Sequence, residues 1–350
     1  MSRGPAPVRL ALLGFGSVGR RFVELLPGPY GRVLRERGLR VVVTGIATAR
    51  HGLAVDGEGL PLRRALALVR AGRALDGLHR GPRIEGAEAF IRRVPADVLF
   101  EITPLAPRTG QPAIRYARLA LARGQHVVTA NKGPVAHARR ALLALARRRG
   151  VRFLHEGAVM DGTPIFNMVE RCLPGAQVLG FRGLLNSTTT RILTAMEQGR
   201  TASEALREAQ AAGVTEADPS HDLEGWDAAV KGCVLANALM GAEVRPPQVR
   251  RRGITGVTGA QAQAALRAGE RLRLIVRASR ASANGRGRGG VTVSVAPERV
   301  PVGDFLVSSG SDGALVLSTD LMGEVGIWEG AGGVDQTAYA LLSDLLAAVG

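Results

Sequence analysis

A glycine-rich turn directly after a short apolar run most constrains the fold of this chain. Residues 8–13 read VRLALL, which predicts a strand, and a segment of helical character begins at Arg20. Between them stand Gly14, Phe15, Gly16, Ser17, Val18 and Gly19. In such a strand, turn and helix, the first glycine permits the tight turn, the second lets a pyrophosphate approach the backbone and the third allows close helix packing. We therefore expect these six residues to bind a dinucleotide at the helix N-terminus, with a purely structural turn as the alternative.

Strands and helices alternate along the first part of the chain, as they do in a doubly wound parallel sheet. Further apolar strands are expected at 39–46, 97–102, 125–129 and 151–155. In open parallel sheets ligands bind outside the carboxyl ends of the strands, where this order places the glycine turn and Lys132. We predict an α/β protein in which residues 1–150 form a Rossmann-type dinucleotide-binding domain.

The pattern changes beyond residue 150. Strands are expected at 177–185, 272–278 and 291–296, with helices among them. We therefore predict an α+β domain with a mixed sheet over residues 151–324. Residues 325–350 are expected to form a glycine turn followed by an amphipathic helix.

The end of the second strand bears on the choice of dinucleotide. An Asp or Glu there would bind the ribose 2′-hydroxyl of NAD and repel the 2′-phosphate of NADP. Thr48 and Arg50 stand in that region instead. We expect both residues to bind the cofactor and NADP to be accepted, with NAD as a second cofactor that the chain could use. The alternative for Arg50 is that it is simply one more surface arginine.

Lysine is almost absent from this basic chain. Of 46 Lys and Arg residues, only Lys132 and Lys231 are lysines. Lysine can lose its proton in a protein and arginine effectively cannot, so these two are the candidates for proton transfer by a basic side chain. Asp227 lies four residues before Lys231, on the same face of a helix predicted from residue 225 onward. The alternative is a solvated helix with an ion pair worth about 0.5 kcal/mol.

Acidic residues precede that helix. The pair Asp218-Pro219 favours an extended or turn conformation. Glu216, Asp218 and Asp222 are then loop residues that can converge near the start of the helix.

The net charge of +16 raises the alternative of a nucleic-acid partner, because clustered cations release counterions from phosphates. The arginines are spread over the whole length and aromatic residues make up only 4%, so we expect a solvated basic surface and no specific nucleic-acid binding.

No apolar run is long enough to cross a membrane and no signal peptide is evident, so we expect a cytoplasmic protein. Cys172 and Cys233 have no metal spacing and are expected to be buried thiols.

Several blocks of sequence, in this order, resemble homoserine dehydrogenase. They read GFGSVGR, DVLFEITP, TANKGPVA, LLNSTTT, EADPSHDLEGWDAAVK and a terminal GAGG followed by TA. The similarity covers nearly the whole chain, which looks like the short form without a C-terminal ligand-sensing domain. It implies NAD(P)-dependent interconversion of L-homoserine and L-aspartate 4-semialdehyde, on the route to threonine, isoleucine and methionine. It also implies a homodimer whose middle domain supplies the interface, and a C-terminal helix that returns to the nucleotide domain.

The resemblance assigns roles to individual residues. Lys231 and Lys132 match the two functional lysines of the family and Asp227 matches the carboxylate paired with Lys231. The residues expected to bind substrate are Glu216, Asp222 and Thr188. Besides the glycine turn, Thr48 and Arg50, those expected to bind the cofactor are Thr103, Asn131, Lys132 and Gly330. Main-chain oxygens of Glu156 and Val159 look like the family's site for a monovalent cation such as Na⁺.

The sequence departs from the family pattern at two places. Thr190 and Arg191 stand where many relatives carry Asn and an aromatic residue, and Met160 and Asp161 replace glycines that are common in the substrate loop. Two other functions stay open at this point. One is reduction of another small semialdehyde or amino acid with NADP, and the other is a non-catalytic, dinucleotide-sensing protein.

The expected chemistry agrees with the residues. Reducing an aldehyde requires a hydride and a proton for the alkoxide, which an ammonium beside the carbonyl can supply. A lysine with an ordinary pKa of about 10.4 is protonated at neutral pH, whereas oxidising homoserine needs it neutral. We therefore expect the oxidative rate to rise from neutral to alkaline pH. Lys231 is the first choice for moving the proton, with Lys132 polarising the oxygen or binding the substrate carboxylate.

Overall fold

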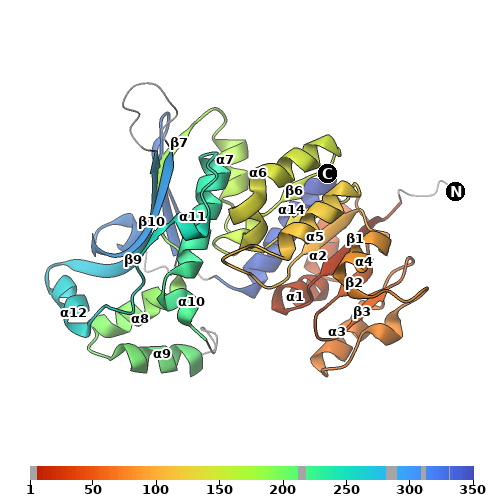
Figure 1. Ribbon diagram of the computed structural model, residues 1–350, viewed down its shortest axis with the longest axis horizontal. Coiled ribbons are helices and arrows are strands. Elements are labelled where there is room, and N and C mark those ends of the chain that lie inside the picture. The colour runs from red at the N-terminus through yellow and green to blue at the C-terminus, as the bar shows by residue number, and fades with distance from the viewer. Residues whose placement is uncertain (1–5, 212–217, 281–289, 309–312, 331) are drawn as a thin grey trace. The chain divides into compact units, whose positions relative to one another are not determined.

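The computed structural model describes residues 6–211, 218–280, 290–308, 313–330 and 332–350. Two compact units make up the chain (Figure 1). The first comprises Met1–Gly162 together with Gly333–Gly350, and the second is Thr163–Gly332. Each unit contains one sheet covered by helices, which confirms the predicted α/β class.

The first unit is built on a six-stranded sheet in the order β3-β2-β1-β4-β5-β6. Its strands are β1 (Val8–Leu13), β2 (Val41–Ala47), β3 (Leu53–Val55), β4 (Val98–Glu101), β5 (His126–Thr129) and β6 (Phe153–Leu154). All neighbouring strands run parallel except β3, which pairs antiparallel with β2. The chain order reverses between β1 and β4, which is where a doubly wound sheet binds its ligand. The predicted Rossmann-type sheet is confirmed.

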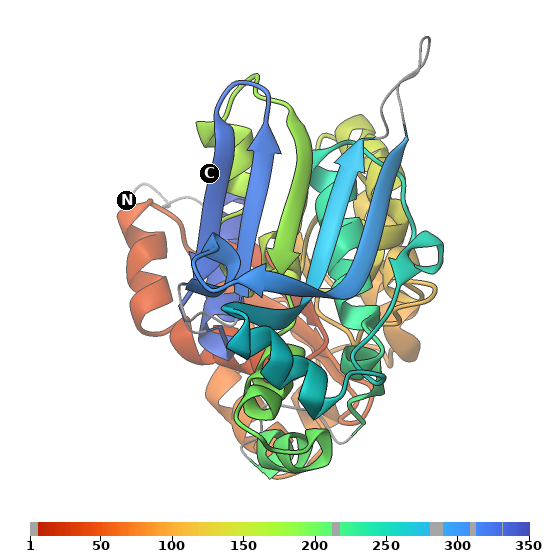
Figure 2. The same cartoon turned by 90° about the vertical axis from the view of Figure 1, so that its left-hand side faces the viewer.

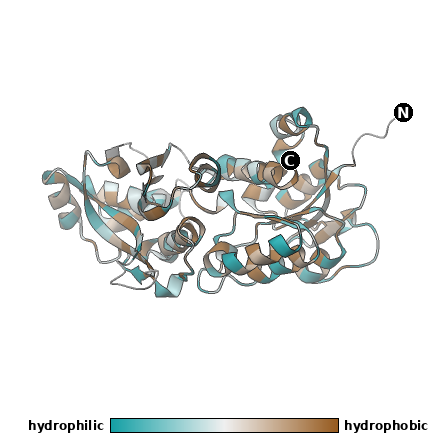
Figure 3. Ribbon diagram, turned by 90° about the horizontal axis from the view of Figure 1, so that it is seen from above, coloured by the Kyte–Doolittle hydropathy of each residue, from teal (hydrophilic) through white to brown (hydrophobic). Residues whose placement is uncertain are grey.

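Helices cover both faces of this sheet (Figure 1). Those of the first unit are α1 (Ser17–Leu25), α2 (Pro29–Glu36), α3 (Leu62–Arg70), α4 (Gly86–Arg93), α5 (Ala113–Ala122), α6 (Lys132–Arg148) and α14 (Val334–Val349). Hydrophilic and hydrophobic residues alternate along the helices (Figure 3). This is the pattern of helices that place one face on a sheet and the other in water.

The C-terminal helix α14 completes the core of the first unit. Its Leu341 and Leu345 are fully buried in the same apolar cluster as Phe22 of α1 and Phe100 of β4. The two aromatic rings lie 4.9 Å apart between their centroids. Because α14 also packs beside α1, the end of the chain holds the helix that follows the glycine turn.

The second unit contains a six-stranded sheet in the order β12-β11-β7-β9-β10-β8 (Figure 2). Its strands are β7 (Val178–Leu184), β8 (Arg250–Arg251), β9 (Glu270–Arg280), β10 (Val291–Pro301), β11 (Gly313–Thr319) and β12 (Gly323–Glu329). The pairs are antiparallel except that β8 runs parallel to β10. The predicted mixed sheet is confirmed.

The helices of the second unit are α7 (Phe166–Cys172), α8 (Ser187–Glu197), α9 (Ala202–Ala211), α10 (Ser220–Leu223), α11 (Trp226–Leu239), α12 (Gly259–Arg267) and α13 (Phe305–Ser308). Helix α11 lies directly on the sheet. A Cβ added to Gly232 would be 2.7 Å from a methyl of Val276 and 2.9 Å from one of Val293, so only glycine allows this approach. The close packing fixes the position of Lys231, the neighbouring residue.

Several details differ from the expectations. Strand β6 pairs with β5, so residues 151–162 belong to the first unit and not to the second. Strand β12 pairs with β11, so residues 325–329 belong to the second sheet and not to the C-terminal segment. Cys172 is exposed at the end of α7, whereas Cys233 is buried as expected. Within the described ranges, no helix is long and apolar enough to cross a membrane.

Candidate active site

The three glycines of the first turn have different surroundings. Gly14 has φ +104°, and a Cβ there would lie 2.3 Å from the main-chain oxygen of Ile102. A Cβ on Gly19 would lie 2.7 Å from the side chain of Ile102. A Cβ on Gly16, by contrast, would meet nothing within 4 Å. Gly14 and Gly19 are therefore required by the packing of β1, β4 and α1, whereas the space beside Gly16 is open for a ligand.

Gly16 is also the N-cap residue of α1. In the part of the chain that the structure describes, no side chain caps this helix and its first turn holds no acidic residue. The first N–H groups of a helix have no partner within the helix, and together with the helix dipole they favour an anion. The turn from Gly14 to Gly19, with Phe15, Ser17 and Val18 between the glycines, can thus hold a pyrophosphate.

The loops that follow β4 and β5 are tied together by a polar network. Asn131 caps α6 by accepting a hydrogen bond from Gly133 N at 2.9 Å, and its amide donates to the Thr103 main-chain oxygen at 3.0 Å. Glu101 accepts hydrogen bonds from Thr103 N at 3.1 Å, from the Thr103 hydroxyl, and from Thr129 Oγ1 at 3.1 Å. The network fixes the loop of Thr103 and the first turn of α6, which begins with Lys132.

Glu101 is a residue to which the sequence assigned no role, although it belongs to the quoted segment DVLFEITP. Its side chain is fully buried at the carboxyl end of β4. Burial raises the pKa of the Glu101 carboxyl above its ordinary value, and hydrogen bonds from Thr103, Thr129 and Asn131 oppose that rise. An acidic residue within an apolar strand was the signal that could have identified it.

Thr48 and Arg50 lie at the carboxyl end of β2. The Thr48 hydroxyl donates to Gly52 O at 3.1 Å and accepts from His51 N at 2.7 Å, so it shapes the turn after the strand. Arg50 is exposed in that turn. Its guanidinium is the charged group that this loop offers to a ligand at the edge of the sheet.

Helix α11 carries the second group of candidate residues. The ammonium of Lys231 lies 3.0 Å from Asp227 Oδ2, and it donates to the Leu185 main-chain oxygen at 2.6 Å. The side chains of Lys231 and Asp227 are only 19% and 17% exposed. An ion pair so far removed from water holds its geometry better than the exposed pair of the alternative interpretation.

Asp222, in the short helix α10 that precedes α11, belongs to the same cluster. Asn186, between β7 and α8, donates from its amide to Asp222 Oδ1 at 2.7 Å and to Asp227 Oδ2 at 3.1 Å. Burial and the neighbouring Asp227 raise the pKa of Asp222, while hydrogen bonds from Asn186 and Thr188 and the charge of Lys231 lower it. A partly buried carboxylate near a lysine can accept a hydrogen bond from a substrate ammonium group and help to orient it.

The predicted site residues thus fall into two groups. Lys231, Asp227, Asp222 and Thr188 come together in the second unit, and Asn186 joins them without having been predicted. Lys132 belongs to the first unit, with Thr103 and Asn131. Glu216 lies outside the described residues. Gly330 follows β12 in the second unit, where a Cβ would be 3.1 Å from the Trp328 ring.

Glu156 and Val159 lie in a buried loop after β6. Glu156 begins a 3₁₀ turn, Glu156–Ala158, and its N–H donates to Asp344 of α14 at 2.9 Å. Met160 and Asp161, the two residues after Val159, have φ of +51° and +48°. This left-handed conformation favours glycine, so Met160 and Asp161 adopt a backbone geometry that is unfavourable for residues with a side chain.

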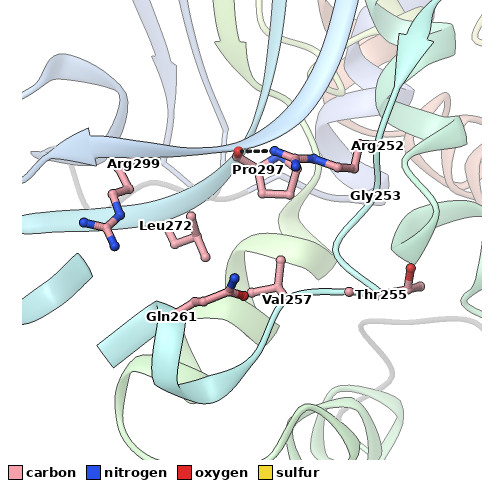
Figure 4. Close-up of a pocket in the computed structure, with 9 residues that line it drawn as sticks. Arg252, Gly253, Thr255, Val257, Gln261, Leu272, Pro297 and Arg299 are labelled. Atoms are coloured by element: carbon pink, nitrogen blue, oxygen red, sulfur yellow. Dashed lines mark hydrogen bonds between the residues drawn. The ribbon is translucent and has the colours of Figure 1, made fainter. Parts of the chain in front are cut away.

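A hollow of about 480 Å³ opens elsewhere in the second unit (Figure 4). It lies beside α12 and β9. Arg252 and Arg299 stand at its edges, and Leu272 lies between them. Its lining contains none of the predicted site residues, so it is separate from the cluster around Lys231.

In comparisons with known proteins, both units of this chain match homoserine dehydrogenases. A family model described as homoserine dehydrogenase, NAD binding domain, matches residues 14–156, and one described as homoserine dehydrogenase matches residues 164–346. An NAD(+)-dependent homoserine dehydrogenase of Pseudomonas canavaninivorans is 36% identical over 97% of this chain and 95% of its own length. The homoserine dehydrogenase of Methanocaldococcus jannaschii is 34% identical over 96% and 97%. A solved structure of a hyperthermophilic archaeal homoserine dehydrogenase in complex with NADPH is 26% identical, with a TM-score of 0.80 over 98% of each chain.

Proposed function

The chain belongs to the homoserine dehydrogenase family, and on that basis we propose which of its residues carry out the reaction and which cofactor it prefers. The activity is the NAD(P)-dependent interconversion of L-homoserine and L-aspartate 4-semialdehyde. The protein is therefore an oxidoreductase of amino-acid biosynthesis. The observation that carries the residue assignment is the ion pair between Lys231 and Asp227, whose charged atoms lie 3.0 Å apart in a largely buried position, close to the partly buried carboxylate of Asp222.

Lys231 is the proton-transferring group in this proposal. During reduction its ammonium donates a proton to the alkoxide oxygen, and during oxidation the neutral amine removes the hydroxyl proton of homoserine. Asp227 holds the amine in place through their ion pair, and the Leu185 main-chain oxygen restricts it further. The bound nicotinamide supplies or accepts the hydride.

The substrate ammonium group is assigned to Asp222 and Glu216, with Thr188 beside Asp222. A carboxylate accepts charge-assisted hydrogen bonds from an ammonium, which are stronger than neutral ones. Lys132 either polarises the reacting oxygen or binds the substrate carboxylate, because it begins α6 at the carboxyl end of β5. The two assignments of Lys132 differ in which kinetic constant its replacement changes.

The cofactor is assigned to the glycine turn, to the loop of Thr103 and Asn131 and, on the second unit, to Gly330. The open space beside Gly16 and the uncapped N-terminus of α1 fit a pyrophosphate. The loop after β2 offers Arg50 and Thr48 to the adenosine ribose. Because family members with either NAD or NADPH are known from the comparisons, the preference for NADP rests on Arg50.

The function is tested by following NAD(P)H absorbance with homoserine and with aspartate 4-semialdehyde as substrates. We expect turnover of both, in opposite directions, and none with other small semialdehydes or hydroxy amino acids. A preference for another semialdehyde would favour the alternative reductase. Cofactor binding without any turnover would favour the non-catalytic, dinucleotide-sensing protein.

Replacing Arg50 by glutamate is expected to reverse the cofactor preference. The new carboxylate would bind the 2′-hydroxyl of NAD and repel the 2′-phosphate of NADP, so kcat/KM with NADP should fall by roughly 10- to 100-fold while that with NAD is kept or improved. Arg40→Glu is the matched control, because Arg40 is exposed just before the amino end of the same strand. Equal losses in the two variants would point to net charge and not to a 2′-phosphate site.

We also propose a homodimer formed through the second unit. Strand β12 is an edge strand of its sheet and exposes Trp328, while Leu321 and Met322 are exposed in the turn before it. An exposed apolar edge strand is normally covered in the functional protein. Light scattering after size-exclusion chromatography tests the assembly, and a monomer at micromolar concentration would contradict it.

A monovalent cation is proposed at the main-chain oxygens of Glu156 and Val159. Both residues are buried in the loop that α14 holds through Asp344. Carbonyl oxygens are suitable ligands for hard cations. Activity measured in sodium salts and in salts of a bulky organic cation at equal ionic strength tests this site.

A further inference from the structure

Asn186 lies at the junction between β7 and α8 and is only 4% exposed. Its amide nitrogen donates to Asp222 at 2.7 Å and to Asp227 at 3.1 Å. Asp222 belongs to α10 and Asp227 to α11, so one amide group connects the carboxylates of two helices. Both hydrogen bonds go to acceptors that are charged when ionised, and such bonds are stronger than neutral ones.

The other end of the Asn186 side chain is fixed as well. Its Oδ1 accepts a hydrogen bond from Thr189 N at 2.9 Å, which caps α8. Once its oxygen is held in this way, its amide can only point toward the two carboxylates. The residue before it, Leu185, receives the hydrogen bond of Lys231 through its main-chain oxygen. The junction therefore contacts all three charged residues of the cluster.

We propose that Asn186 is a positioning residue that sets the orientation of both carboxylates, aligning Asp222 with the substrate ammonium and Asp227 with Lys231. The proposal rests on the proposed function of this cluster. Asn186 itself does not exchange a proton, because an amide side chain does not titrate. Its effect is exerted through the two acids whose oxygens it binds.

The electrostatics of the cluster support this role. Two charged groups act on Asp222 in the described part of the chain, and both belong to α11: they are Asp227 and Lys231. The groups that reach Asp222 from the start of α8, Asn186 and Thr188, are neutral. Burial and Asp227 raise the pKa of Asp222, and the hydrogen bond from Asn186 lowers it. Without that bond the pKa of Asp222 rises further, so less of the carboxylate is ionised at a given pH. The acid limb of the activity profile should then move to higher pH.

Two substitutions distinguish the role of Asn186 as the N-cap of α8 from its proposed role in positioning the two carboxylates. Serine and aspartate are N-cap residues as good as asparagine, so Asn186→Ser and Asn186→Asp keep the start of α8. Neither retains the amide: serine is too short to reach the acids, and aspartate adds a third negative charge. We expect kcat/KM for homoserine to fall by roughly 10- to 100-fold in Asn186→Ser and by more in Asn186→Asp. In both variants the acid limb of kcat/KM should shift to higher pH.

Asn237→Ser is the matched control. Asn237 is a similarly buried asparagine of α11, whose side chain bonds to Val244 N at 2.9 Å and to Val244 O at 3.0 Å. Its replacement should lower the melting temperature and leave the pH profile for homoserine unchanged. If Asn186→Ser keeps wild-type kcat/KM and its pH profile, or loses activity only in proportion to its melting temperature as Asn237→Ser does, the proposal is wrong. Absence of homoserine turnover in the wild-type protein would instead contradict the proposed function.

Discussion

Replacing Lys231 by methionine is expected to lower kcat for homoserine oxidation by roughly 10²- to 10⁴-fold, the range attributed to a positioned general acid or base. Methionine has a similar length and is apolar, so it can occupy the same largely buried space near Leu185 without creating a large cavity. The substitution removes the ion pair with Asp227, whose Oδ2 keeps the hydrogen bond from the Asn186 amide. Melting temperature and NADPH binding, measured on the same sample, distinguish the loss of chemistry from a loss of fold.

The variant Lys231→Arg tests the nature of the role. Arginine keeps the positive charge and an ion pair with Asp227, but it effectively cannot give up its proton. If Lys231 transfers the proton, Lys231→Arg should be nearly as impaired as Lys231→Met, and the rise of the oxidative rate toward alkaline pH should disappear. Substantial activity in Lys231→Arg would show that this residue acts only through its charge.

Lys132→Met is the comparison within the same chain. If Lys132 binds the substrate carboxylate, its replacement should raise KM for homoserine more than it lowers kcat. If it polarises the reacting oxygen, kcat should fall instead. A larger loss of kcat in Lys132→Met than in Lys231→Met would reverse the assignment of the two lysines.

Local patterns predicted the parts of the site that depend on short spacings. Asp227 and Lys231 are four residues apart in a helix, and that spacing alone brought them onto one face, where they form the ion pair. The strand, glycine turn and helix at the N-terminus were likewise predicted from one continuous stretch that begins at Val8. In both cases neighbours along the chain provide the geometry, so no long-range contact had to be known.

The start of α8 was missed because local preference and tertiary context disagree there. The strand expected at 177–185 is soon followed by three threonines at 188–190, whose branched side chains favour strands over helices, so no helix start was expected there. The side chain of Asn186 begins the helix at this point by bonding to Thr189 N. The Asn186 bonds to Asp222 and Asp227 span 36 and 41 residues, so no local pattern could indicate them.

Glu101 shows a similar limit. A glutamate at the end of an apolar strand could be exposed or buried, and only the pairing of β4 with β1 and β5 determines that it is buried.

The domain boundaries were also set by strand pairing. Strands β6 and β12 are short or edge strands whose membership in a sheet depends on partners elsewhere in the chain. Such partners are not visible in a single sequence.

Changing Gly14 to alanine is expected to destabilise the first unit by about 2 to 6 kcal/mol, which combines the cost of an unfavourable left-handed residue with that of overpacking. The φ of +104° is outside the range that alanine adopts readily, and the new Cβ would lie 2.3 Å from the Ile102 oxygen. That oxygen belongs to the backbone, so it cannot move aside as a flexible side chain could. A loss of this size is a large share of the stability of a typical domain.

Changing Gly16 to alanine should instead leave the stability nearly unchanged and weaken cofactor binding. Its backbone has φ −74° and ψ −161°, which alanine adopts without strain, and the new Cβ would meet no atom within 4 Å. Gly16→Ala should therefore melt within a few degrees of the wild type, yet bind NADPH roughly 10- to 100-fold more weakly because the methyl group occupies the space assigned to the pyrophosphate. Thermal melts and fluorescence titrations with NADPH measure the two effects separately. Wild-type cofactor affinity in a well-folded Gly16→Ala would mean that the pyrophosphate does not lie against this turn, and the glycines would then be explained by packing alone.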